Sequence, residues 1–200
     1  MLKIVLASQN EGKLVEIQDL LKSLEIRFIP QTKLDIPSVE ETGTTFVENA
    51  IIKARHAAKY SGLPALADDS GLIITALNSA PGVFSSRYAG DNATDSDRMQ
   101  KVLKELENAD SPDRSASFHC ILALIENETD PAPLICHGVW EGEIAYEPKG
   151  KNGFGYDPIF YIPSHRCTAA ELDFKEKNII SHRGQALQEL VAILTNAFLA

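Results

Sequence analysis

The order of apolar patterns along this chain constrains its fold more than any other feature. Residues 2–7 form a short apolar run typical of a buried strand, and residues 25–30 form a second one. Residues 11–24, between them, repeat apolar side chains at three- and four-residue steps, which predicts an amphipathic helix. A similar pattern predicts a helix over residues 45–61. Strands and helices therefore alternate early in the chain, which favours an α/β fold.

The second half of the chain adds long strands to this alternation. Residues 114–127 and 133–147 predict two long strands, most simply an antiparallel pair. A glycine-rich loop over residues 150–163 leads into a further strand, and helices are predicted over 94–108 and 181–198. We therefore expect an α/β fold built around a mixed β-sheet with helices packed against it.

No linker divides the chain. The proline-containing segments 110–114 and 129–133 are short loops, and the sequence contains no internal repeat or low-complexity stretch. Residues 1–200 are therefore expected to form a single domain, for which two lobes remain an option.

The charge and the cysteines limit the partners and the compartment. A formal net charge of -9 argues against binding to a nucleic-acid polymer, which needs a basic face. A small anionic substrate would have to be held by local cations or a metal ion. No apolar run is long enough to cross a bilayer, so no membrane association is expected. Cys120, Cys136 and Cys167 give no disulfide framework, which favours a cytoplasmic location.

Two adjacent carboxylates interrupt an apolar run at residues 64–72, PALADDSGL. An unpaired charge is expensive in a buried strand. Either a turn carries Asp68 and Asp69 into water, or the two acids hold a cation. Because Asp, Ser and Gly are turn formers, two short strands flanking a DDSG turn are expected here.

Positive side chains stand at two predicted helix starts, where the helix dipole disfavours them. Lys13 follows a polar loop that contains Ser8 and Asn10, and His182 and Arg183 follow Ser181. Such exceptions to local rules are enriched at functional sites, and a helix start can bind an anion. The alternatives are a solvated Lys13 behind an Asn10 cap, and an Arg183 paired with a nearby acid.

Glycines flank two aromatic residues in the stretch NGFGYDPIF. Phe154 and Tyr156 either expose a ring for stacking on a flat ligand or simply cover the core. On helix 45–61, Lys53 falls on the face opposite the apolar stripe.

Taken together, these motifs resemble the inosine triphosphate pyrophosphatase family, its bacterial branch in particular. The matching segments are SQNEGK (8–13), EETG (40–43), FVENAIIKA (46–54), ADDSGL (67–72), PGVFSSRYAG (81–90), GFGYDPIF (153–160) and EKNIISHRGQAL (176–187). Each motif alone is weak, but the ordered set is specific and covers almost the entire chain. The chain departs from the family pattern at Lys175 and at His165, Arg166 and Cys167, which bears on substrate ranking and on local loop structure.

The resemblance implies hydrolysis of non-canonical purine nucleoside triphosphates (ITP, dITP and XTP) to the monophosphate and pyrophosphate. It also implies a long twisted mixed sheet, two lobes with an active-site cleft between them, a homodimer and a requirement for Mg²⁺. Asp69 would be the general base and a metal ligand, with Glu41 contributing to the metal site and Ser70 contacting substrate. The remaining implied substrate-binding residues are Ser8, Gln9, Asn10, Glu11, Gly12 and Lys13 for the triphosphate, Phe154, Gly155, Tyr156 and Asp157 for base and sugar, and Lys177, His182 and Arg183 for base recognition.

The chemistry of a triphosphate gives these acids a reason to be there. Mg²⁺ offsets phosphate charge while bound to one or two carboxylates, so Asp69 and Glu41 are expected to hold it, with Asp68 as a second or outer-shell acid. Adjacent acids also raise each other's pKa, which would help one of them to accept a proton from water. The water would attack the α-phosphorus and expel pyrophosphate, with Lys13 and Lys53 stabilising the phosphate chain.

Three other interpretations compete with this one. A zinc hydrolase could use the FHC and ICHG stretches, but adjacent strand residues face opposite ways and cannot share one metal. A non-enzymatic nucleotide sensor would keep the loops without needing the acids. A related pyrophosphatase of the same fold could act on pyrimidine or methylated nucleotides.

Overall fold

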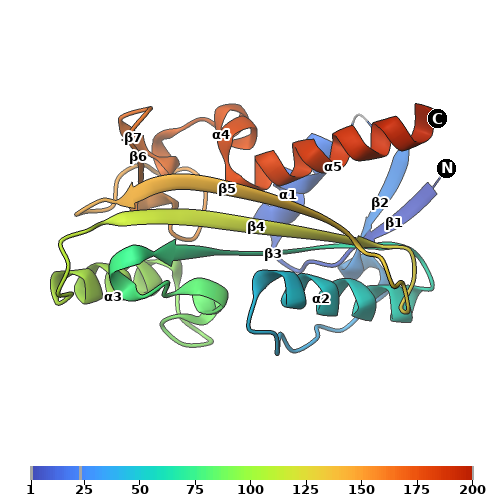
Figure 1. The fold of residues 1–200 in the computed structure, drawn as a ribbon, viewed down its shortest axis with the longest axis horizontal. Helices are drawn as coiled ribbons and strands as arrows, with labels where there is room; N and C mark the ends of the chain where they lie inside the picture. Colours follow the sequence, from blue (N-terminus) through green and yellow to red (C-terminus); the bar gives the residue numbers. More distant parts are fainter. Residues whose placement is uncertain (1, 23, 200) are drawn as a thin grey trace. The chain divides into compact units, whose positions relative to one another are not determined.

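A computed structural model describes residues 2–22 and 24–199, with side chains described through residue 196. Within those residues the strands form one seven-stranded sheet in the order β2-β1-β3-β4-β5-β6-β7 (Figure 1). The bounds are β1 Leu2–Leu6, β2 Ile26–Pro30, β3 Ala65–Ile74, β4 Ser115–Ile125, β5 Leu134–Ile144, β6 Phe160–Ile162 and β7 Cys167–Thr168. Strand β1 pairs in parallel with β2 and β3, whereas β6 pairs antiparallel with β5 and β7. The mixed sheet expected from the sequence is confirmed, and the two long strands β4 and β5 are neighbours in it.

The helices expected from the apolar periodicity are present. Their bounds are α1 Glu11–Leu21, α2 Phe46–Ser61, α3 Asp95–Glu107 and α5 His182–Leu199. Residue 23, inside the range predicted for the first helix, lies outside the described residues. A further helix, α4 Phe174–Ile180, was not expected, because seven residues are too few to show a repeated apolar stripe. None of the described helices combines the length and apolar character needed to cross a membrane.

The expected turn at Asp68 and Asp69 is wrong. Strand β3 continues without interruption from Ala65 through both aspartates to Ile74. The turn was inferred from the cost of burying unpaired charges, and that cost is removed here by cations that approach from neighbouring helices. The residue types alone, all of them common in turns, therefore misled the prediction.

The chain divides into two compact units. Unit 1 comprises Met1–Asp69, Cys120–Gly138 and His182–Ala200, and unit 2 comprises Ser70–His119 and Val139–Ser181. The boundaries fall within β3, β4 and β5, so each of these strands contributes residues to both units. The expectation of a single domain over residues 1–200 stays a prediction.

Unit 1 has an apolar core on each face of its strands. On one face, alternate strand residues pack with α1 and α5, and on the other they pack with α2 (Figure 1). Strand β1 shows the alternation: Ile4 and Leu6 belong to the first core, and Val5 and Ala7 belong to the second. Helix α2 presents small side chains to the sheet, so its backbone can lie close to the strands; these are Ala50, Ala54, Ala57 and Ala58.

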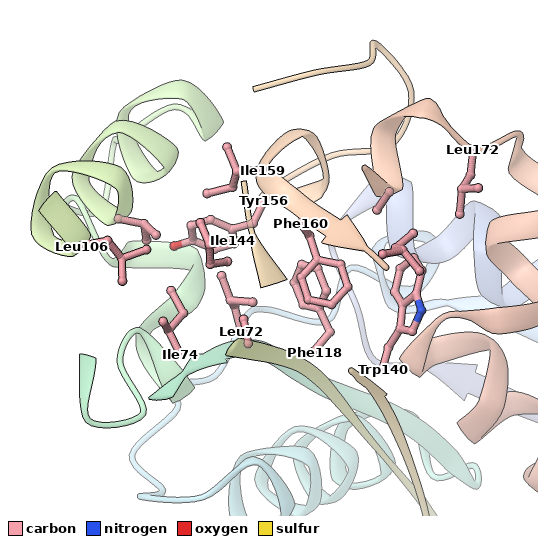
Figure 2. Close-up of a cluster of buried hydrophobic side chains, with 14 residues drawn as sticks. Leu72, Ile74, Leu106, Phe118, Trp140, Ile144, Tyr156, Ile159, Phe160 and Leu172 are labelled. Carbon is pink, nitrogen blue, oxygen red and sulfur yellow. The ribbon is translucent and has the colours of Figure 1, made fainter. Parts of the chain in front are cut away.

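Unit 2 is organised around aromatic side chains. Phe160 contacts both Phe118 and Trp140, with ring centroids 4.6 Å and 5.1 Å away, respectively (Figure 2). Tyr156, from the glycine-rich loop, belongs to the same buried cluster and is only 4% exposed. This cluster anchors the end of the loop that carries several of the predicted substrate-binding residues.

Candidate functional site

The two aspartates of β3 face opposite sides of the sheet, because successive residues of a strand alternate. Leu66 packs with α1 and α5, so Asp68, two residues later, faces those helices. Ala65 and Ala67 pack with α2, so Asp69 faces that helix. The acids quoted as a pair in the sequence are therefore parts of two separate side-chain clusters, both within unit 1.

Asp68 lies in a buried cluster of alternating charges. Its Oδ2 is 2.8 Å from Lys13 Nζ and 3.4 Å from an Arg183 nitrogen, and the Asp68 side chain is 1% exposed. Arg183 also forms an ion pair with Glu16 of α1. Burial would raise the pKa of Asp68, but Lys13, Arg183 and Lys53 outweigh it and hold that pKa well below its usual range. Asp68 is therefore a permanent counter-ion for cations of α1 and α5.

This arrangement resolves the two unusual helix starts. Lys13, near the start of α1, is matched by the carboxylate of Asp68, and Asn10 caps that helix by accepting a hydrogen bond from Lys13 N at 3.0 Å. Arg183 pairs with acids, as the alternative stated, and its side chain is 3% exposed. His182 is the first residue of α5 and is 5% exposed. The contacts of Arg183 favour a supporting role, and its predicted contact with the base remains untested.

The polar loop before α1 is more exposed to solvent than the buried side chains of Asp68 and Arg183. Ser8 Oγ accepts a hydrogen bond from Asn10 N at 3.3 Å. Gln9, Asn10 and Glu11 are exposed, whereas Ser8, Gly12 and Lys13 are partly buried. The segment joins the end of β1 to the first turn of α1, where free backbone N–H groups are available to an anion.

Asp69 forms a second cluster with Lys53 of α2 and Glu41. Lys53 Nζ lies 2.8 Å from Asp69 Oδ1 and 2.9 Å from Glu41 Oε1. The other carboxylate oxygen, Asp69 Oδ2, is buried and has no hydrogen-bond partner. Burial is the main reason that the pKa of Asp69 is raised, and nearby Glu41 adds to it, although Lys53 opposes the shift. A buried carboxylate with a raised pKa and an unused oxygen is suited to accept a proton.

The loop that carries Glu41 is fastened to the start of α2. Gly43 N donates to Asn49 Oδ1 at 2.8 Å, and Asn49 is fully buried. Thr45 and Glu48 form a capping box that fixes the first turn of the helix. Since Lys53 lies two turns further along α2, the lysine and the Glu41 loop are held by the same rigid element.

The expected mutual rise in the pKa values of the two aspartates is wrong. The pKa of Asp68 is lowered, and the rise at Asp69 comes first from burial and not from its neighbour. Opposite faces and separate cations account for the difference, since each carboxylate responds mainly to the helix that covers it.

Glu41 and Asp69 fit the ligand requirements of a divalent cation. Both direct a carboxylate oxygen at one position, now taken by an ammonium group, and Asp69 has an oxygen to spare. Mg²⁺ is bound in this way, by one or two carboxylates together with water and phosphate oxygens. Among the described residues no group of three or more His, Cys, Asp or Glu is arranged for a metal. Asp68 as a further ligand remains a prediction, and its contacts with Lys13 and Arg183 favour a different role.

The glycine-rich loop of unit 2 is held by its own polar contacts. Asp157 Oδ2 accepts hydrogen bonds from Phe154 N at 2.9 Å and from Lys177 Nζ at 2.7 Å. Lys177 Nζ also lies 4.7 Å from the centroid of the Phe154 ring. Gly155 adopts a φ of 65°, a conformation that favours glycine, and its N–H donates to Asp95 Oδ2 at 2.7 Å.

Within that loop the two aromatic residues have different environments. Tyr156 is buried in the core, and its hydroxyl donates to Ser85 O at 2.8 Å, so it fixes the loop to the apolar cluster of unit 2. Phe154 is partly exposed. Ser70, the first residue of unit 2, is partly exposed within β3. The structure thus brings Phe154, Asp157 and Lys177 together, and their predicted roles in binding base and sugar stay a prediction.

Sequence reasoning missed two residues of these clusters, Glu16 and Asp95. Glu16 lies 167 positions from Arg183, and Asp95 lies 60 positions from Gly155. Asp95 is the first residue of α3 and Glu16 stands beside the apolar stripe of α1, and neither position indicates its distant partner.

The cysteines of the competing zinc interpretation lie in the apolar core. Cys120 and Cys136 both pack in the cluster of unit 1 that contains α1 and α5. Burial raises the pKa of the Cys120 thiol to about 12, which opposes the thiolate form that zinc needs. Packing is therefore the better account of both residues.

The fold and the charge clusters define an α/β protein in which a buried strand carries two aspartates, each paired with cations of the helices on its own face. Comparison with known proteins narrows this class. The model of the Ham1 family matches residues 4–193, and the chain belongs to that family.

Individual relatives agree with this assignment and with the family resemblance seen in the motifs. A dITP/XTP pyrophosphatase of Coxiella burnetii is 76% identical over 199 residues, covering 100% of both chains. One from Escherichia coli K12 is 52% identical and covers 98% of this chain and 100% of its own. Among solved structures, a HAM1 protein from Coxiella burnetii superposes with a TM-score of 0.94 at 76% identity, covering 98% of this chain and 100% of that one.

Proposed function

We propose that this chain is a nucleoside triphosphate pyrophosphatase that hydrolyses non-canonical purine nucleotides (dITP, XTP and ITP) to the monophosphate and pyrophosphate. The names of its full-length relatives support the substrate class. The main structural support for the proposed reaction is the environment of Asp69. Its carboxylate is buried, with one oxygen bound to Lys53 and the other without a hydrogen-bond partner.

Asp69 Oδ2 accepts a proton from the attacking water. The water oxygen forms a bond to the α-phosphorus, the bond from that phosphorus to the bridging oxygen breaks, and pyrophosphate leaves with the electron pair. Lys53 and Lys13, which are 15% and 17% exposed, supply positive charge to the phosphate oxygens. The polar segment Ser8–Lys13, which leads into the first turn of α1, binds the same phosphate chain.

Glu41 and Asp69 would hold Mg²⁺, which when bound supplies charge neutralisation to the polyphosphate. Both carboxylates already hold a cation, the Lys53 ammonium, and this supports the assignment.

Recognition of the purine base is assigned to Phe154, Asp157 and Lys177 of unit 2, which contact one another. Phe154 offers a partly exposed ring for stacking, and its neighbour Gly155 allows a close approach. Lys177 and Asp157 are a donor and an acceptor held beside that ring. Hypoxanthine and xanthine carry a carbonyl at C6 where adenine has an amino group, so a donor such as Lys177 favours the former. A homodimer and a cytoplasmic location belong to the same proposal.

The test is an assay of purified protein with dITP, XTP, ITP, GTP and ATP, with and without Mg²⁺, measuring pyrophosphate and orthophosphate separately. Pyrophosphate from the first three, dependent on Mg²⁺, is the expected result. Release of orthophosphate would contradict attack at the α-phosphorus. A preference for pyrimidine or methylated nucleotides would instead favour the related pyrophosphatase.

Replacing the proposed base separates an enzyme from a nucleotide sensor. Asp69→Asn keeps the shape of the side chain but cannot accept the proton, so turnover should fall by about 100-fold or more. Asp19→Asn, which removes an exposed carboxylate from α1, is the matched control and should leave turnover unchanged. Equal turnover in the Asp69→Asn variant would reject Asp69 as the base.

A further inference from the structure

Lys53 occupies the position at which the proposed site would hold a divalent cation. Its Nζ lies 2.9 Å from Glu41 Oε1 and 2.8 Å from Asp69 Oδ1. These are hydrogen-bonded, charge-assisted contacts, and the Lys53 side chain is only 15% exposed. An ammonium group and a metal ion cannot both sit between the same two oxygens.

Lys53 is a cation shared by the two carboxylates that would hold the divalent ion, and Asp69 Oδ2 is buried without a hydrogen-bond partner. The Lys53 ammonium is therefore held by both carboxylates, in the position between Glu41 Oε1 and Asp69 Oδ1 that a divalent ion would take.

We propose that Lys53 is an internal counter-cation that competes with the divalent ion for Glu41 and Asp69, so that the ion binds only by displacing the ammonium. This inference extends the proposed function, because it uses the same two carboxylates. It concerns the free protein, however, and needs no nucleotide.

The structure of α2 limits what has to move. A capping box fixes the start of the helix, and its small residues Ala50 and Ala54 pack against the sheet with 0% exposure. Lys53 carries its charge on a flexible four-carbon stem, so the ammonium can leave while the helix stays in place. The phosphate chain of a bound nucleotide would accept the displaced charge, and we therefore expect the nucleotide to favour binding of the ion.

The decisive experiment measures metal binding without nucleotide. Mn²⁺, a paramagnetic substitute for Mg²⁺, is titrated into metal-free protein and the free ion is followed by electron paramagnetic resonance. Lys53→Met keeps much of the stem and removes the charge, so Mn²⁺ affinity should rise by about tenfold or more relative to wild type. Lys59→Met removes an exposed lysine of the same helix, paired with Glu128, and should leave the affinity unchanged. Equal or weaker binding by Lys53→Met, including binding by neither protein, would overturn the proposal.

Thermal unfolding provides a second readout. In EDTA, Lys53→Met should unfold at a lower temperature than wild type, since both carboxylates lose the ammonium that they share, and saturating Mn²⁺ should close this gap. A gap that Mn²⁺ leaves unchanged counts against the proposal.

If the Met variant does not fold, Lys53→Arg tests the same point, because it keeps the charge. Its Mn²⁺ affinity should stay as low as that of wild type, and a tighter affinity would refute competition by charge. Failure of the proposed function would show instead as absent nucleotide hydrolysis, whatever the affinity for Mn²⁺.

Discussion

Asp68 should contribute more to stability than any exposed acid of this chain. Its carboxylate is 1% exposed, and it is the shared partner of Lys13 and of Arg183, whose side chain is 3% exposed. Asp68→Asn keeps the volume but removes the charge from between two cations. Removing one member of a buried ion pair costs about 3–5 kcal/mol, because the remaining charge stays buried without compensation.

The lower end of that range applies here. Lys13 is 17% exposed and can reach water, and Arg183 keeps its ion pair with Glu16. The asparagine oxygen can also accept a hydrogen bond. We therefore expect a loss of about 3 kcal/mol in the free energy of unfolding, which for a chain of this length lowers the melting temperature by roughly 6–12 °C.

Urea unfolding of metal-free protein at pH 7 measures this loss. Asp19→Asn, which breaks the exposed pair with Lys22 on α1, is the control and should cost less than about 0.5 kcal/mol. An Asp68→Asn variant within 0.5 kcal/mol of wild type would show that the buried cluster does not stabilise the fold.

The stability difference between wild type and Asp68→Asn should depend on pH in a direction that the pKa of Asp68 determines. The pKa of Asp68 is held well below its usual range in the folded protein, so its stabilising effect is fully present above the unfolded pKa of about 4. The effect is lost as the pH falls towards the lower, folded pKa. The stability difference between wild type and Asp68→Asn should therefore be constant from pH 5 to 7 and shrink below about pH 4. A difference that persists unchanged at lower pH would contradict the assignment.

Two further changes test the remaining packing and charge contacts by urea unfolding. Lys177→Met leaves the Asp157 carboxylate, 4% exposed, without its lysine and should cost about 3 kcal/mol, whereas Lys175→Met at an exposed position of the same helix should cost little. An equal effect of the two would remove Lys177 from the support of the loop. Gly138→Ala should cost about 1–3 kcal/mol, because a Cβ there would overlap the carbonyl oxygen of His182, and a neutral result would show that α5 can shift.

Local sequence signals were sufficient for most elements of the fold. The possible cap at Asn10 and the apolar stripes gave α1 and α2 close to their observed starts. Each of these signals acts over a few residues, so it can be read without knowing the tertiary structure. The alternation of strands and helices then restricted the topology to a mixed sheet.

The turn wrongly predicted at Asp68 and Asp69 reflects contacts between residues that are far apart in the sequence, which local signals do not reveal. Whether a charge can be buried depends on its partners, and the partners here are Lys13, Lys53 and Arg183, which are distant in sequence from both aspartates. The motif order pointed to candidate site residues, but it could not show which cation faces which acid. Only the alternation of a continuous strand separates the two clusters.

The side-by-side aspartates of β3 are joined by a single peptide unit, yet they pair with cations of helices on opposite faces of the sheet. A deletion or insertion of one residue upstream in this strand would turn each carboxylate towards the other's helices and separate it from its own cations. The spacing of residues in Ala65–Asp69 therefore matters to both charge clusters at once, so a change of length there should be tolerated far less than a substitution.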